Sequence, residues 1–116
     1  MVVFASSIIP SFSVATPSNI APIAVWFDGN PQSTILYPTF YGFNVAAQTS
    51  PGLWITILHW DFGDGSTLNS VYSAQSYVSE IRYHQYAQAG VYTVTVTAYD
   101  NIGDSATAQI TVFWPF

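Results

Sequence analysis

The chain has 116 residues, half of them hydrophobic and 17% aromatic, so it can bury the core of a single domain. Charged residues make up only 6% of it, the formal net charge is −5, Arg82 is its one Lys or Arg, and it contains no cysteine. This balance argues against nucleic-acid binding and against adhesion to an anionic membrane, because both depend on clustered basic side chains. With so few carboxylates, we also expect the stability of the fold to vary little with pH.

The first stretch of the chain, Met1–Thr16, is apolar and uncharged. It lacks the cationic region of a signal peptide, and its short length and Pro10 argue against a membrane-spanning helix. We predict that residues 1–18 form an N-terminal arm or linker and that residues 19–116 form the folded domain. The arm either packs on its own domain, which we favour, or donates a strand to the sheet edge of a neighbouring subunit.

Short strands separated by turn residues follow the arm. Ile23–Phe27 is predicted to be the first strand, Asp28–Pro31 forms a turn, and Ile35–Ala47 carries the second strand. After a turn at Ser50–Gly52, the strand Leu53–Phe62 is expected to alternate between its two faces with the period of two that β-strands have. One face of this strand is predicted to carry Trp54, Thr56, Leu58, Trp60 and Phe62, and the other Ile55, Ile57 and His59.

The second half of the chain continues the succession of strands and turns. Gly65–Tyr77 is polar, and we predict an added hairpin or an irregular loop without a buried face, which would be the least ordered internal segment. Val78–Tyr83 is another predicted strand. Tyr92–Ala98 and Ala106–Val112 alternate most clearly, with apolar residues facing inward and Thr or Gln facing outward. About seven short strands without helical periodicity predict an all-β sandwich of two antiparallel sheets.

Two motifs lie on this pattern. Residues Trp60–Gly65 read Trp-Asp-Phe-Gly-Asp-Gly, so a strand ends in a turn whose glycines permit positive φ angles. Downstream, a His-x-Tyr run precedes a Gly-x-Tyr run. Over roughly residues 20–112 the chain resembles the polycystic kidney disease (PKD) domain family, an immunoglobulin-like β-sandwich found mostly on cell surfaces and in secreted proteins. The resemblance implies structural roles for the motif residues Trp60, Asp61, Phe62, Gly63, Asp64, Gly65, His84, Tyr86, Gly90 and Tyr92.

The features of an immunoglobulin-like sandwich also fit particular residues. Such folds bury a Trp on the third strand and place a Tyr two residues before a core position on the penultimate strand. Trp60 fits the first role and Tyr92 the second, and Val94 then stands where antibody domains have a cysteine. The predicted core therefore includes Trp60, Phe62, Tyr92, Val94, Val96 and Ile110.

Four aspartates in two turn regions are weak candidates for a calcium site. Calcium takes about six to eight oxygen ligands, and the chain has no Asp-x-Asp-x-Asp-Gly loop to supply them. We favour the alternative in which the carboxylates of the motif accept backbone N–H bonds and hold the turn. We therefore predict no cofactor and keep calcium as the weaker alternative. Its candidate ligands are Asp61, Asp64, Asp100 and Asp104.

The sequence offers no combination of residues that is typical of catalysis. His59 and His84 are isolated and form no His-x-His or His-x-x-x-His pair. No Gly-x-Ser-x-Gly elbow, phosphate-binding loop or pair of neighbouring carboxylates is present. We therefore predict that the chain is not an enzyme.

Aromatic side chains are more numerous than the interior of one sandwich can hold. Tyr and Trp are enriched at protein interfaces, whereas Lys and Glu are depleted there. We therefore predict an interface with other protein subunits, ahead of carbohydrate stacking or a rim of exposed tyrosines. The interface candidates are Phe4, Phe12, Ile55, Ile57, Tyr99, Phe113, Trp114 and Phe116.

Three classes of function are consistent with these observations. The leading hypothesis is a structural and interaction module, a PKD-like subunit or decoration of an extracellular assembly such as a surface layer, a filament or a virus particle. The second is a ligand-binding module for calcium or a glycan. The third is an accessory domain of a secreted protein. The partners are expected to be other protein subunits, through self-association or a surface or virion assembly, and the expected location is extracellular, on a cell surface or in a virion.

Overall fold

The computed structural model describes residues 22–29, 32–33 and 40–115, and within them every regular element is a β-strand. No helix in this part of the chain is long and apolar enough to cross a membrane. The strands are β1 (Ala24–Phe27), β2 (Gln32–Ser33), β3 (Tyr41–Gln48), β4 (Ile55–Asp61), β5 (Thr67–Val71), β6 (Tyr77–His84), β7 (Gly90–Asp100) and β8 (Ser105–Trp114).

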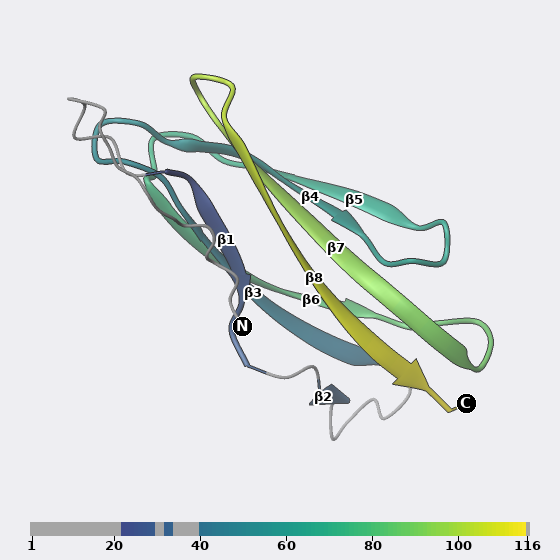
Figure 1. Cartoon of the computed structure of the whole chain (residues 1–116). Helices are drawn as coiled ribbons and strands as arrows, with labels where there is room; N and C mark the ends of the chain where they lie inside the picture. The colour runs from purple at the N-terminus through teal and green to yellow at the C-terminus, as the bar shows by residue number, and fades with distance from the viewer. Residues whose placement is uncertain (1–21, 30–31, 34–39, 116) are drawn as a thin grey trace.

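The strands form two antiparallel sheets that face each other as the layers of a sandwich (Figure 1). In sheet A, β3 pairs with β6 on one side and with β1 and then β2 on the other. Sheet B has the order β5-β4-β7-β8. The predicted all-β sandwich of two antiparallel sheets is therefore confirmed. Residues 35–39 of the predicted second strand, and the predicted arm over residues 1–18, lie outside the described residues.

The register of the strands defines two ends of the sandwich. At one end, which we call the Asp100 end, Ile55 pairs with Asp100, and the hydroxyl of Thr49 donates to the Asp100 carboxylate across the sheets. At the other, the motif end, β4 runs into the turn of the Trp60–Gly65 motif. The chain enters β1 at the Asp100 end and leaves β8 at the motif end, because Ala24 pairs with Gln48 and Trp114 pairs with Gly90. β1 lies against β8, and both strands run in the same direction.

The core lies between the two sheets and follows the alternation of apolar residues. Trp60, Phe62, Val94 and Val96 are buried, and Tyr92 and Ile110 are partly buried against them, so the predicted core is confirmed. Trp60 contributes the largest fully buried side chain. It packs edge-on against Phe27 of sheet A at a ring separation of 6.3 Å. Aromatic contacts from both sheets therefore hold the layers together.

The predicted facing of β4 is wrong at its first residues, because the strand contains a β-bulge. Its register with β7 shifts between Ile55 and Ile57, so Ile55 turns inward and is fully buried. Trp54, which strict alternation placed on the core face, is 39% exposed. An extra residue in one strand reverses the faces on either side of it, and the sequence carries no signal for that insertion.

The segment after the motif contains a regular strand. β5 pairs with β4 over five residues, so the hairpin alternative for Gly65–Tyr77 is confirmed and the irregular loop is wrong. The expectation that this segment has no buried face is also wrong, because Ser70 is buried. The buried hydroxyl of Ser70 lies between β5 of sheet B and β6 of sheet A, where it donates to the Glu80 carboxylate.

Candidate interaction surfaces

The motif turn is held by its own aspartates. The Asp61 carboxylate accepts the N–H of Gly63 at 2.9 Å, and the Asp64 carboxylate accepts the N–H of Ser66 at 3.0 Å. The preferred interpretation of both aspartates as acceptors for turn N–H groups is confirmed. Gly63 has a φ of +87°, and a Cβ atom there would lie 2.5 Å from the carbonyl oxygen of Thr93. This position therefore requires glycine for two separate reasons.

His84 connects the turn to sheet A. Its Nε2 lies 2.7 Å from Oδ2 of Asp64, and its ring stacks on Phe62 at 4.1 Å with an interplanar angle of 2°. Partial burial by itself raises the pKa of Asp64, but the bonds from His84 and the Ser66 amide outweigh it and hold the pKa below its ordinary value. The histidine therefore has a structural role beside the turn.

The two motif tyrosines complete this end of the core. The Tyr86 hydroxyl donates to the carbonyl of Phe62 at 2.7 Å, and the Tyr92 hydroxyl donates to the carbonyl of Gln88 at 2.7 Å. Their rings stack at 3.9 Å. Burial and, secondarily, the nearby Asp64 charge raise the pKa of Tyr86, so its hydroxyl stays protonated as a donor. A Cβ atom at Gly90 would lie 3.5 Å from the ring of Tyr92.

A polar cluster joins the two sheets at the edge between β5 and β6. Glu80 is its centre, and the indole Nε1 of Trp60 donates to Oε2 of Glu80 at 2.8 Å. The Ser70 hydroxyl and Arg82 Nε donate to the same oxygen at 2.8 and 2.9 Å. The Tyr72 hydroxyl donates to Oε1, and Arg82 Nη2 donates to Ser70 Oγ at 2.8 Å. We call Trp60, Ser70, Tyr72, Glu80 and Arg82 the inter-sheet cluster.

The inter-sheet cluster contains the one glutamate and the one Lys or Arg of the chain. Burial raises the pKa of Glu80, but hydrogen bonds from the other four members outweigh it and lower the pKa below its ordinary value. Burial and the Glu80 carboxylate raise the pKa of Tyr72 to about 12. Every oxygen of Glu80 has a donor, so the arrangement fits a structural clamp. Sequence reasoning missed this cluster, although Glu80 and Arg82 lie two residues apart on one face of a strand.

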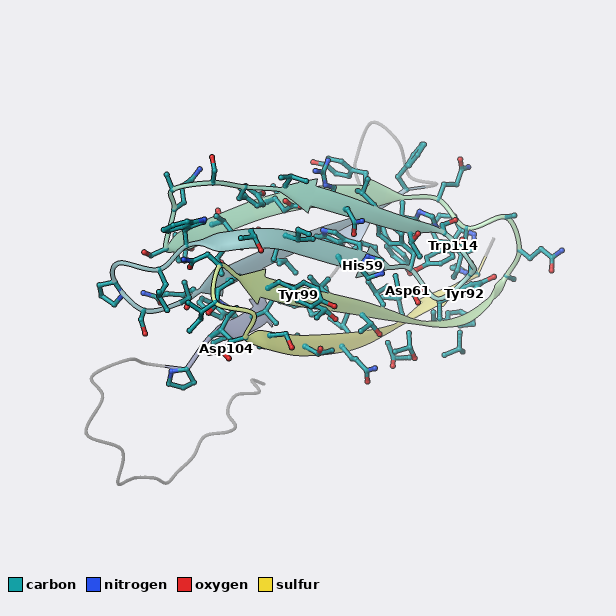
Figure 2. All side chains as sticks on the ribbon, turned by 90° about the horizontal axis from the view of Figure 1, so that it is seen from above. His59, Asp61, Tyr92, Tyr99, Asp104 and Trp114 are labelled. Atoms are coloured by element: carbon teal, nitrogen blue, oxygen red, sulfur yellow. The ribbon has the colours of Figure 1, made fainter. Side chains whose placement is uncertain are left out.

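The four candidate calcium ligands lie at two different ends of the sandwich. Figure 2 shows Asp61 and Asp104 well apart, and β4 separates them by about 20 Å at 3.3 Å per residue. Asp100 is buried, and its Oδ1 accepts the N–H groups of Ile102 and Asp104 at 3.2 and 3.0 Å. Asp61, Asp64, Asp100 and Asp104 therefore cannot hold one ion together. The described residues contain no cluster of three metal-ligating side chains.

His59 lies on the outer face of sheet B (Figure 2), away from His84, which faces the interior. Its Nδ1 lies 2.6 Å from the side-chain oxygen of Asn69 on β5. The two histidines thus belong to different surfaces, and each has a local partner.

Two of the predicted interface residues come together on the outer face of sheet B. Ile57 pairs with Tyr99 on β7 and with Val71 on β5, so the three form one row across the sheet. Val71 is 79% exposed and Tyr99 is 40% exposed. We call this the apolar row. Sequence reasoning missed Val71, because it left a hairpin and an irregular loop open for that segment and assigned no strand register to it.

The C-terminal candidates divide between the interior and the surface. Trp114 is wrong as an interface residue, because it is buried with its ring 5.1 Å from that of Tyr41. β8 continues through Trp114, so the alternation that buries Val112 buries Trp114 as well. Phe113 faces outward, 63% exposed, and pairs with the exposed Val91. Phe4, Phe12 and Phe116 lie outside the described residues.

A second exposed surface covers the outer face of sheet A and was missed by the sequence analysis. It carries Trp26 on β1 and three side chains of β6, and the rings of Trp26 and Tyr77 contact each other at 6.5 Å. None of its described outward-facing residues on β1, β3 and β6 is charged. The alternation of β6 does not identify it, because each face of the strand mixes polar and apolar residues: Val78, Glu80 and Arg82 face inward, and Ser79, Ile81 and Tyr83 face outward. The exposed residues of β6 are Tyr77, Ile81 and Tyr83, with 50%, 51% and 57% of their surface accessible.

The chain is similar to proteins of one family. The family model described as PKD domain matches residues 19–113. The PKD1 domain of Vibrio anguillarum Epp aligns with a TM-score of 0.54 and 20% identity, over 84% of this chain and 98% of that one. The PKD domain of an M14-like peptidase from a Thermoplasmatales archaeon gives a TM-score of 0.55 and 21% identity, over 84% and 96% of the two chains. No curated protein matches the chain.

Proposed function

Because this chain belongs to the PKD domain family, whose members are typically non-enzymatic modules of secreted proteins, we propose that it is a structural and interaction module. It serves as a subunit or decoration of an extracellular assembly, such as a surface layer, a filament or a virus particle, and its partners are other protein subunits. PKD domains occur in secreted or extracellular proteins, which supports this location.

The observation that carries the proposal is the set of apolar and aromatic side chains exposed on the outer faces of both sheets, of which the described outer face of sheet A is uncharged. The apolar row on sheet B and the exposed side chains of β6 on sheet A present aromatic and aliphatic groups to solvent. Exposed apolar patches of this kind mark interaction sites, and Tyr is among the residues enriched at their centres. The polar groups of the motif and of the inter-sheet cluster are, by contrast, occupied by bonds within the fold.

Light scattering of the purified chain over a range of concentrations tests the proposal. The expected result is a mass above the 12.7 kDa of one chain that rises with concentration. Substituting the apolar row with Ile57→Thr and Tyr99→Thr keeps β-forming residues in both strands and is expected to weaken association on that face. A chain that stays at 12.7 kDa under all conditions contradicts self-assembly.

A second candidate is an accessory domain of a secreted hydrolase. It is favoured by one of the similar structures, which is the PKD domain of a peptidase. An accessory domain of this kind acts beside a catalytic partner and is expected to stay monomeric by itself. The same light-scattering experiment therefore separates the two candidates.

A further inference from the structure

β6 lies beside β3 in sheet A (Figure 1), and its other edge has no paired strand within the described residues. The amide of Thr49 donates to the carbonyl of Ser76 at 2.8 Å, one step beyond the β3–β6 ladder. In an antiparallel pair alternate residues exchange these bonds, so the even-numbered residues of β6 bond to β3. The backbone N–H and C=O groups that point to the open edge are those of Tyr77, Ser79, Ile81 and Tyr83.

This edge lacks several of the usual protections against pairing. Natural sheet edges are blocked by lysines, prolines, bulges, short strands or charges that point inward. Of these, β6 has only the inward charges of Glu80 and Arg82, which bond to each other inside the fold. The chain has no lysine, and β6 runs for eight residues without proline. Three of the four side chains at these positions, those of Tyr77, Ile81 and Tyr83, are apolar or aromatic and about half exposed. Such an edge is a template for another strand.

We propose that two copies of this chain associate through β6, with the strands antiparallel about a two-fold axis at Ile81. Sheet A of one copy then continues into sheet A of the other. The inference rests on the interaction function proposed above, and it names both the surface and the partner. In this register Ile81 faces Ile81 of the second copy, and Ser79 faces Tyr83.

Charge selects this register. Glu80 and Arg82 project from the same face of β6, and with the axis at Ile81 each Glu80 lies opposite the Arg82 of the other copy, twice in the dimer. Within each copy Arg82 bonds to Glu80 and Ser70, and the Glu80 side chain is only 8% exposed, so the two copies set these charges in alternation and do not exchange partners. An axis at Glu80 would instead set the two glutamates directly opposite each other. Opposite charges stabilise a cross-strand pair, whereas like charges destabilise it.

Proline at position 79 tests the edge. The Ser79 amide points away from β3, so Ser79→Pro removes a donor that only the dimer needs, and edge positions of this kind tolerate proline. Light scattering is expected to give twice 12.7 kDa for the wild type and 12.7 kDa for Ser79→Pro, with unchanged circular dichroism. Ser79→Ala keeps the amide and is the matched control, which is expected to remain dimeric.

A second pair of variants tests the same edge without proline, in case Ser79→Pro misfolds. Ile81→Lys places a charge on the edge strand, and Ile102→Lys places the same charge in the β7–β8 turn. The two isoleucines are 51% and 53% exposed, so the variants are closely matched. Ile81→Lys is expected to be monomeric and Ile102→Lys dimeric.

Cysteine variants test the register, because the natural chain has no cysteine. Residues directly opposite in a hydrogen-bonded antiparallel pair have Cα atoms about 5.5 Å apart, within the range of a disulfide. Ile81→Cys is expected to form a disulfide-linked dimer on oxidation. The two copies of Ser79→Cys would lie about 13 Å apart and are expected not to form one. A disulfide-linked dimer with Ser79→Cys and none with Ile81→Cys would overturn the register.

The outcomes separate this inference from the proposed function. If the Ser79→Pro and Ile81→Lys variants self-associate as strongly as the wild type, pairing through β6 is overturned and the interaction function still stands. A chain that is monomeric at every concentration contradicts both.

Discussion

At the scale of single residues, the two glycines of the motif turn provide a direct comparison. Both have positive φ, but only Gly63 approaches another backbone, with 2.5 Å between its missing Cβ and the Thr93 carbonyl oxygen. No atom lies within 4 Å of the corresponding position at Gly65. Gly63→Ala is therefore expected to lower the free energy of unfolding by about 2–4 kcal/mol, and Gly65→Ala by about 1–2 kcal/mol.

Urea denaturation of the two glycine variants measures this difference. Equal losses at both positions would show that the approach to Thr93 is relieved by a small movement of β7.

The residues of the motif were predictable from the sequence to the extent that their roles are local. Asp61 and Asp64 bond to amides two residues away, and such turns follow from sequence spacing. Glu80 was not predictable in this way, because its donors Trp60 and Ser70 come from the opposite sheet. Alternation tells which face of a strand a residue occupies, but not which side chain meets it across the sandwich.

At the scale of elements, prediction succeeded where strands alternate without interruption. β7 and β8 carry regular apolar and threonine positions, and their inward residues are those expected. β4 failed at its start, because the bulge between Ile55 and Ile57 adds a residue that leaves no trace in the hydrophobic pattern. β5 is short and polar, and it forms because it can pair with β4, which is information from outside the segment.

The position of β5 at the edge of sheet B leads to a prediction about its stability. β5 pairs with one neighbour, whereas β7 lies between β4 and β8. Amide hydrogen exchange is therefore expected to be faster in Thr67–Val71 than in Tyr92–Ala98, although slower than in the turn that precedes β5. Exchange in β5 as slow as in β7 would indicate that the inter-sheet cluster, through Ser70, protects the whole edge.

At the scale of the whole molecule, the pH dependence of stability is determined by a small number of carboxylates. The folded-state pKa values of Glu80 and Asp64 lie below their ordinary values of 4.5 and 3.8. The unfolded chain thus binds protons more readily than the folded one as the pH falls, so these groups contribute stability above about pH 5 and lose it as the pH drops through their folded-state values. The melting temperature is expected to be nearly constant from neutral pH to about pH 5 and to fall below it, so the small pH dependence expected from the composition holds only above about pH 5.

Glu80→Gln identifies the source of the decrease in acid. The amide keeps one acceptor but cannot titrate, so the variant is expected to be less stable at neutral pH by about 1–3 kcal/mol and to lose less on acidification. Thermal melting across the acid range provides the measurement. A decrease in acid as steep as that of the wild type would assign the effect to Asp64 and the remaining carboxylates.

The opposite placement of the two ends of the described chain determines how this domain responds to mechanical tension. Ala24 starts β1 at the Asp100 end and Trp114 finishes β8 at the motif end, with the two strands side by side. A pull between them acts along the strands, so the hydrogen bonds of β1 with β3 and of β8 with β7 are loaded together in shear. They cannot open one after another as in a zipper. Because forced unfolding is governed by the rate of unfolding, this geometry is expected to let the domain bear load without unravelling from either end.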